Sequence, residues 1–181
     1  MSGKRVLVTG AGTIGMLVAT VARAFGGIPV AVSDIIAARR AQAVELGADV
    51  ALDPSASDLK ERVGELTGDG FDLVFEASGS PLALRGAFDL VRRGGTIVQI
   101  GTIGTEDVPI PVNQLMVNEI NLIGSMRYGN VFDEAIRLVT SGRVNLQPFI
   151  NGVFALDESA KALRLASDKS RSLKIQIQLE S

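Results

Sequence analysis

The segment from Val6 to Gly15 constrains the fold of this chain more than any other. A short apolar run ends there in Thr-Gly-Ala-Gly-Thr-Ile-Gly, and apolar residues then keep helical spacing through residues 14–25. This is Gly-x-Gly-x-x-Gly placed directly after a strand and opening a helix, the context that gives the motif meaning. Gly10 permits the tight turn, Gly12 lets a diphosphate approach the backbone, and Gly15 lets the helix pack against the sheet. The segment predicts a strand–loop–helix unit that binds a dinucleotide.

An acidic residue at the end of the second apolar run strengthens this interpretation. The amides around Thr13 and Ile14, together with the helix dipole, would face the anion. Asp34 follows Gly15 by 19 positions, where a dinucleotide fold needs a carboxylate for the ribose hydroxyls. Such a carboxylate repels a 2′-phosphate, so the pair favours NAD over NADP. The alternative is that Asp34 only caps a helix that begins near Ala37.

Apolar runs and helical patterns alternate over most of the chain. The early runs are apolar on both faces, as in parallel strands covered by helices on each side. We therefore expect an α/β fold, a doubly wound parallel sheet of six strands of the Rossmann type. The expected strands are 6–8, 29–32, 50–52, 72–75, 96–100 and 120–123, and the expected helices are 14–25, 37–46, 58–66, 82–91 and 131–140.

The last part of the chain has a different pattern. Residues 157–166 are expected to form a helix, and residues 174–179 alternate strictly between polar and apolar side chains. That period of two indicates a strand buried on one face only. We expect a dinucleotide-binding domain over residues 1–145 and a C-terminal helix–strand appendage over residues 146–181.

Composition excludes several kinds of chemistry within this chain. It has no Cys and no His, which removes thiolate nucleophiles, imidazole acid–base catalysis and the commonest zinc ligands. Eighteen basic and 20 acidic residues without a basic block, and only eight aromatic residues, do not support nucleic-acid binding. No run of apolar residues is long enough to span a membrane. We expect a cytoplasmic protein.

Several longer stretches resemble the coenzyme domain of the medium-chain zinc alcohol dehydrogenase superfamily. The resemblance covers essentially the whole chain and is nearest to the sorbitol and L-idonate 5-dehydrogenase branch. It is carried by GKRVLVTGAGTIG (3–15), VSD (32–34), ELGAD (45–49), FDLVFEASGS (71–80), RRGGTIVQIG (92–101) and GSMRYGN (124–130).

The resemblance implies further roles at the cofactor site. Arg39 would lie beside the adenosine ribose, and Arg127 would pair with the diphosphate through a bidentate guanidinium. The remaining implied residues are Ala77, Ser78 and Gly79 near the adenosine and Ile100, Gly101 and Thr102 near the nicotinamide. Both arginines have a plainer interpretation, as solvated helix charge and surface ion pair.

Complete members of that superfamily carry a further catalytic domain that supplies the zinc ligands. We therefore expect this chain to be the NAD-binding half of a zinc-dependent polyol or sugar-acid dehydrogenase, which binds cofactor without turnover when alone. Zinc is expected only in the catalytic domain, outside this chain, and the C-terminal segment would return to that domain. The alternatives are a stand-alone dinucleotide-binding or sensor module and a degenerate domain kept for association. The resemblance also implies a homodimer through the edge strand at residues 121–125.

Overall fold

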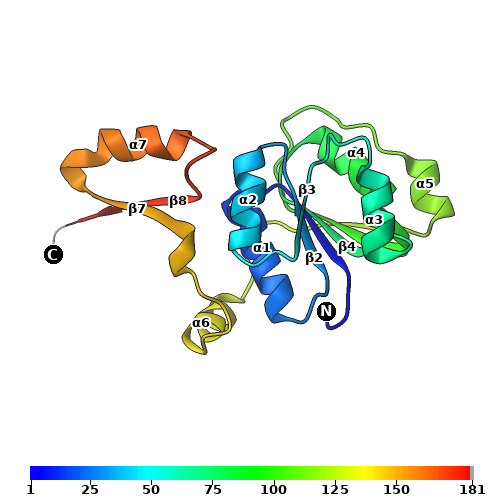
Figure 1. Cartoon of the computed structure of the whole chain (residues 1–181), viewed down its shortest axis with the longest axis horizontal. Coiled ribbons are helices and arrows are strands. Elements are labelled where there is room, and N and C mark those ends of the chain that lie inside the picture. Colours follow the sequence, from blue (N-terminus) through cyan, green and yellow to red (C-terminus); the bar gives the residue numbers. More distant parts are fainter. Residues whose placement is uncertain (180–181) are drawn as a thin grey trace. The chain divides into compact units, whose positions relative to one another are not determined.

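The computed structural model describes residues 1–179, which form two compact units divided between Tyr128 and Gly129 (Figure 1). Compact units need not fold independently, so the expected domain division at residue 145 stays a prediction. No helix among the described residues is long and apolar enough to cross a membrane.

The first unit is built on a parallel sheet with the strand order β3-β2-β1-β4-β5-β6. This order confirms the predicted doubly wound fold, in which the direction of winding reverses between β1 and β4. The strands are β1 (Val6–Thr9), β2 (Val30–Ser33), β3 (Val50–Leu52), β4 (Phe71–Glu76), β5 (Val91–Gln99) and β6 (Asn121–Gly124).

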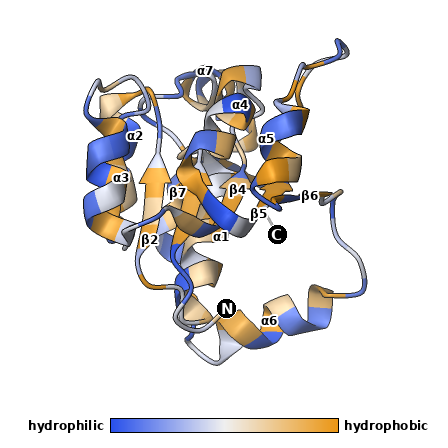
Figure 2. Cartoon of the chain, turned by 90° about the vertical axis from the view of Figure 1, so that its right-hand side faces the viewer, coloured by the Kyte–Doolittle hydropathy of each residue, from blue (hydrophilic) through white to orange (hydrophobic). Residues whose placement is uncertain are grey.

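Helices cover both faces of this sheet. Figure 1 shows α1 and α2 on one side and α3 and α4 on the other. In Figure 2, β2 is apolar while α2 carries hydrophilic residues, as its exposed surface requires. The helices of this unit are α1 (Thr13–Ala24), α2 (Ala37–Glu45), α3 (Leu59–Thr67), α4 (Pro81–Leu90) and α5 (Val112–Val117).

Two elements of the first unit differ from the sequence prediction. Strand β5 begins at Val91, where the pattern suggested the end of a helix. Its pairing with β4 shifts register between Val91 and Thr96, where Gly94 has a φ of +68°. Helix α5 is six residues long and was not among the expected helices, since Pro109 and Pro111 interrupt the sequence before it. Pro111 precedes its first turn, a position where the missing N–H costs nothing.

The strands are in register across the sheet, and this sets the chemistry of its carboxyl edge. One row places Leu7 beside Val74 and Val74 beside Ile97, all fully buried in one core cluster. Because side chains alternate, the residues two positions later lie on the same face. That next row is polar, and runs Thr9, Glu76 and Gln99. The apolar core therefore ends in a polar row where the strands end.

The second unit contains helix α6 (Phe132–Thr140), two short 3₁₀ turns, Gln147–Phe149 and Leu156–Glu158, and a small sheet with a helix. Strand β7 (Ile150–Ala155) pairs in parallel with β8 (Lys174–Gln178), and α7 (Ser159–Ser167) connects them. The expected C-terminal helix and strand are confirmed. Strand β7 was missed, because Asn151-Gly152 reads as a turn.

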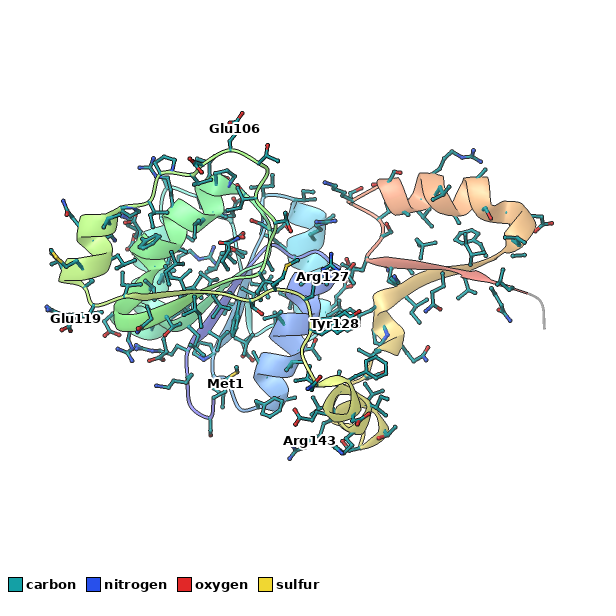
Figure 3. The ribbon with its side chains drawn as sticks, turned by 180° about the vertical axis from the view of Figure 1, so that it is seen from behind. Met1, Glu106, Glu119, Arg127, Tyr128 and Arg143 are labelled. Atoms are coloured by element: carbon teal, nitrogen blue, oxygen red, sulfur yellow. The ribbon has the colours of Figure 1, made fainter. Side chains whose placement is uncertain are left out.

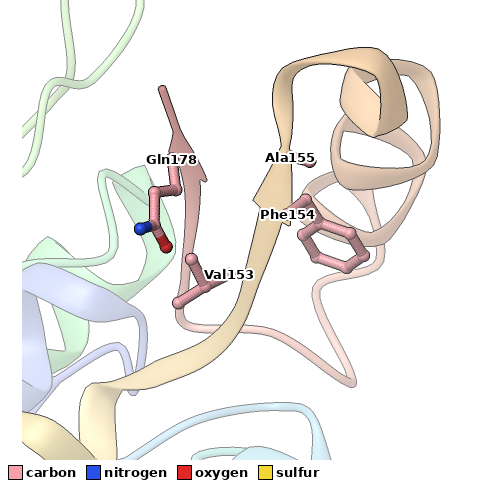
Figure 4. Close-up of a pocket in the computed structure, with 4 residues that line it drawn as sticks. All are labelled: Val153, Phe154, Ala155 and Gln178. Carbon is pink, nitrogen blue, oxygen red and sulfur yellow. The ribbon is translucent and has the colours of Figure 1, made fainter. Parts of the chain in front are cut away.

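An open hollow in the second unit is lined by Val153, Phe154, Ala155 and Gln178 (Figure 4). None of these side chains is ionisable, and no polar groups converge on it. We assign it no function.

Candidate dinucleotide site

The candidate site lies at the carboxyl edge of the first unit's sheet, where β1 and β4 are neighbours. The amide of Gly10 donates to the Ser33 carbonyl over 2.7 Å, and the amide of Ala77 donates to the Thr9 carbonyl over 3.0 Å. The loops after β1, β2 and β4 therefore leave the sheet from adjacent points. In open α/β sheets, ligands bind in the crevice outside the strand ends at this switch point.

Two glycines of the loop after β1 are required by close packing. Gly10 has a φ of +91°, and a Cβ there would lie 2.8 Å from the Ser78 Cα. A Cβ on Gly15 would lie 1.8 Å from the Gly10 carbonyl oxygen. Any side chain at either position would force the loop apart, so these glycines hold the loop tightly against the sheet and the β4 segment.

Gly12 is different, because its Cβ direction is open. The nearest atom to a Cβ built there is the Arg39 Nη1 at 3.7 Å. Gly12 is also the N-cap of α1, without a side-chain cap hydrogen bond, and the first turn of α1 holds no acidic residue. Thr13 and Ile14, the other predicted members of this loop, begin that helix. The front of the loop is thus a glycine surface at the positive end of a helix dipole.

Asp34 is buried against this loop, with only 8% of its surface exposed. Its Oδ2 accepts a hydrogen bond from the Ala11 amide and its Oδ1 accepts one from the Ile36 amide, both over 2.8 Å. The second bond is an Asx turn that ends one residue before α2, whose N-cap Ile36 makes no side-chain cap hydrogen bond. A carboxylate has about four acceptor positions, so these two bonds leave capacity for a ribose diol.

Two arginines from α2 flank this carboxylate. The Arg39 Nη1 lies 3.9 Å from the Asp34 Oδ2, and its side chain is only 16% exposed. Arg40 donates from Nη1 to the backbone carbonyls of Asp34 over 2.8 Å and Ile35 over 3.1 Å. Its Nη2 pairs with the Asp53 Oδ2 at 2.8 Å. Arg39 therefore lies between Gly12 and the Asp34 carboxylate, whereas Arg40 fixes the backbone that carries Asp34. The place of Arg39 beside an adenosine ribose stays a prediction.

The segments after β4 and β5 meet at the same edge. A Cβ on Gly79 would lie 2.6 Å from the Thr102 carbonyl oxygen, and a Cβ on Gly101 would lie 2.3 Å from the Gly79 amide nitrogen. The amides of Ile100 and Gly101 both donate to the Glu76 carbonyl over 2.8 Å. The two predicted groups, residues 77–79 and 100–102, are therefore in contact with each other.

Arg127 is the predicted residue that no described contact joins to the loop. It lies beyond the end of β6, in the left-handed region with a φ of +54°, and is exposed (Figure 3). The Ser125 amide donates to the Gln99 carbonyl over 2.9 Å, so Arg127 follows the same strand edge two residues later. Its role at the diphosphate stays a prediction.

Sequence reasoning missed four residues of this edge: Thr9, Arg40, Glu76 and Gln99. A carboxylate that closes the apolar run Phe71–Glu76 was a signal for Glu76, since an ionisable group there is buried with its strand. Arg40 gave no comparable signal, because its neighbour Arg39 has the same charge and only the helix geometry separates their roles.

Among the described residues, no group of three or more acidic side chains could hold a metal ion. The residues present do not fit a catalytic zinc.

Comparison with known proteins decides the family. The family described as zinc-binding dehydrogenase matches residues 13–141. The chain belongs to this family. It is 30% identical over 177 residues to an L-idonate 5-dehydrogenase (NAD(P)(+)) of Escherichia coli K12, covering 98% of this chain and 51% of the relative. It is 34% identical over 181 residues to the sorbitol dehydrogenase of Macaca fascicularis, covering 98% and 50%.

Solved structures agree with these relatives. The crystal structure of the Escherichia coli L-idonate 5-dehydrogenase matches with a TM-score of 0.87 at 30% identity, covering 97% of this chain and 50% of that one. An alcohol dehydrogenase from Escherichia coli CFT073, complexed with cofactor NADH, matches with a TM-score of 0.89 at 27% identity, covering 97% and 52%. The chain spans about half the length of the relatives that it matches.

Proposed function

We propose that this chain binds NAD(H) at the carboxyl edge of its six-stranded sheet. The observation that carries the proposal is the joint geometry of the Gly10–Gly15 loop and Asp34. The loop offers a glycine without a side-chain cap at a helix N-terminus, and the carboxylate is fixed beside it by the Ala11 amide. A diphosphate and its adenosine ribose need this pair of features.

Each predicted residue then has a task toward the dinucleotide. Gly12 and the start of α1, at Thr13 and Ile14, would receive the diphosphate, while Asp34 and Arg39 would hold the adenosine ribose. Ala77, Ser78 and Gly79, which follow β4, would lie near the adenosine. The nicotinamide would lie at Ile100, Gly101 and Thr102, and Arg127 would add charge to the diphosphate side.

We propose further that the chain is the coenzyme-binding part of a polyol or sugar-acid dehydrogenase. When bound, NAD accepts a hydride from the alcohol carbon, and the hydroxyl proton leaves as the carbonyl forms. This chain's residues bind and orient the dinucleotide. Zinc would be held by residues other than those described here. We also propose that the protein is cytoplasmic.

We also propose that the chain forms a homodimer through β6. This strand is the last in the sheet order, and Ile123 on it is 50% exposed. An edge strand with exposed apolar side chains invites pairing with another copy.

Titration with NADH tests the binding proposal. The chain has no Trp and one Tyr, so the coenzyme's own fluorescence can be followed with little protein background. We expect a saturable change in that fluorescence, and ADP-ribose should compete with it. No saturable change up to millimolar NADH would contradict the proposal.

A further inference from the structure

Glu76 is a fully buried carboxylate at the end of β4, with 0% of its surface exposed. It stands in the polar row that follows the buried apolar row of Leu7, Val74 and Ile97 on the same face. Burying an ionised group is costly unless hydrogen bonds replace its hydration. The contacts of Glu76 therefore show whether hydrogen bonds compensate for the lost hydration of its carboxylate.

Hydrogen-bond donors surround both oxygens of Glu76. Its Oε1 accepts from the amides of Ser78 and Gly79 over 2.9 and 3.1 Å, from the Thr9 hydroxyl over 3.3 Å, and from the Ser78 hydroxyl. Its Oε2 accepts from the Gln99 Nε2 over 2.6 Å and from the Gly79 amide over 3.2 Å. The backbone N–H groups and the Gln99 Nε2 can only donate, so each oxygen is met by a group that needs an acceptor. This arrangement suits the ionised carboxylate.

These donors are all neutral groups. They solvate the negative charge of Glu76 with dipoles, whereas a salt bridge would cancel its field at a distance. In a region of low dielectric such a field acts on nearby charges more strongly than it would in water. The carboxylate of Glu76 is therefore a fixed anion inside the sheet edge.

This anion lies directly beneath the segment that we assign to the nicotinamide. A Cβ built on Gly101 would lie 2.7 Å from the Glu76 Oε2. The Gln99 side chain joins the two, since its Nε2 also donates to the Gly101 carbonyl over 2.7 Å. Little besides the backbone of Gly101 separates the Glu76 carboxylate from the surface at that residue.

We propose that Glu76 biases this site toward the oxidised cofactor, NAD⁺, relative to NADH. The inference rests on the proposed dinucleotide binding and on the placement of the nicotinamide at residues 100–102. The nicotinamide ring carries a positive charge in NAD⁺ and none in NADH, while the rest of the molecule is the same. A fixed negative charge beneath the ring attracts only the oxidised form.

The test is the ratio of the Kd values for NADH and NAD⁺, measured on the full chain by calorimetry. Glu76→Gln removes the charge at nearly constant volume. We expect it to lower the ratio Kd(NADH)/Kd(NAD⁺) on the order of fivefold, the size expected of one charge acting through a partly screened medium. Damage to the shape of the site would weaken the binding of NADH and NAD⁺ alike and leave this ratio unchanged.

Two further variants separate charge from shape. Glu76→Gln places an amide against the Gln99 Nε2, so the loss of that hydrogen bond needs its own control. Gln99→Leu removes the same bond and keeps the carboxylate, and its ratio should stay within about twofold of the wild type, below the shift expected from removing a charge. Glu76→Asp keeps the charge but draws it back by one methylene, and its ratio should fall between those of the wild type and Glu76→Gln.

ADP-ribose, which lacks the nicotinamide, distinguishes the possible failures. If Glu76→Gln binds all three ligands with an unchanged ratio, the bias is wrong and the dinucleotide site stands. If Glu76→Gln does not fold, an unchanged ratio in Glu76→Asp has the same meaning. If the wild-type chain binds none of the three ligands, the proposed function and this inference both fail.

Discussion

The backbone amide of Ala11 donates a hydrogen bond to the Asp34 carboxylate, with 2.8 Å between the nitrogen and Oδ2. This bond joins the loop after β1 to the end of β2, 23 residues later in the chain. It fixes the carboxylate before any ligand arrives, so the entropy of ordering it is spent in folding rather than in binding.

The open face of the loop can be tested with alanine at Gly12. A Cβ there meets only the Arg39 Nη1 at 3.7 Å, so the protein should fold normally. The same methyl would occupy the approach of the diphosphate, and we expect NAD affinity to fall at least about tenfold, the cost of roughly 1.4 kcal/mol. Calorimetry and thermal unfolding measure the two effects.

Gly64→Ala is the matched control for that change. Gly64 lies in α3, and a Cβ there has nothing within 4 Å. We expect a stabilisation of about 0.5–1 kcal/mol from helix propensity, with unchanged NAD affinity. Equal loss of NAD affinity in both variants would contradict the assignment of Gly12 to the site.

Arg40 should act on the cofactor through Asp34. Arg40→Ala removes the bond to the Asp34 carbonyl and the ion pair with Asp53, and loosens the turn that carries the carboxylate. We expect NAD affinity to fall about three- to tenfold, or roughly 1 kcal/mol, the net contribution of a typical hydrogen bond. Arg85→Ala, at an exposed position on α4, should leave the affinity unchanged.

The amino-terminal end of the sheet, opposite the candidate site, should control the stability of the fold in acid. Burial alone would raise the pKa of Asp72, but hydrogen bonds from Arg5 and Arg92 outweigh it and hold that pKa well below its ordinary value of 3.8. The folded state therefore prefers the ionised form. The stability from this group is present above about pH 4 and is lost as the pH falls toward the folded pKa.

Asp72→Asn isolates this contribution. At pH 7 we expect it to lower the free energy of unfolding by about 2 kcal/mol, because both arginines lose a charged partner. The difference from the wild type should shrink as the pH is lowered below 4. Urea unfolding at several pH values measures it, and a constant difference across that range would be inconsistent with the ion-pair network.

The homodimer proposal predicts association at tens of micromolar protein. Sedimentation should give a dimer for the wild type, and Ile123→Lys should give a monomer by placing a charge on the exposed edge of β6. A wild-type chain that sediments as a monomer at that concentration would rule out this interface.

Periodicity and glycine spacing predicted the six-stranded sheet, most clearly where a buried strand is a continuous apolar run. β1 and β2 are buried at every position, which is the pattern that the sequence shows. Asp34 and the glycine loop were predictable for the same reason, since their spacing follows from the strand–helix–strand unit. Strand β7 was not predictable, because Asn151-Gly152 is accommodated there by a register shift against β8.

The roles of Glu76 and Arg40 depend on contacts between segments distant in sequence. Glu76 is held by groups from β1, β5 and the loop after β4, and only the register of the sheet brings these together. Sequence spacing alone gives no indication of such a cluster.

The most direct measurement is the affinity of the Asp34→Ala chain for NAD⁺ by calorimetry, beside Glu65→Ala as an exposed acidic control on α3. Loss of a charged acceptor for the ribose hydroxyls should weaken binding on the order of tenfold to a hundredfold, since hydrogen bonds to charged groups contribute about 1.5–3 kcal/mol. Glu65→Ala should bind as the wild type does. An Asp34→Ala chain that remains folded and binds NAD⁺ with wild-type affinity would contradict the account.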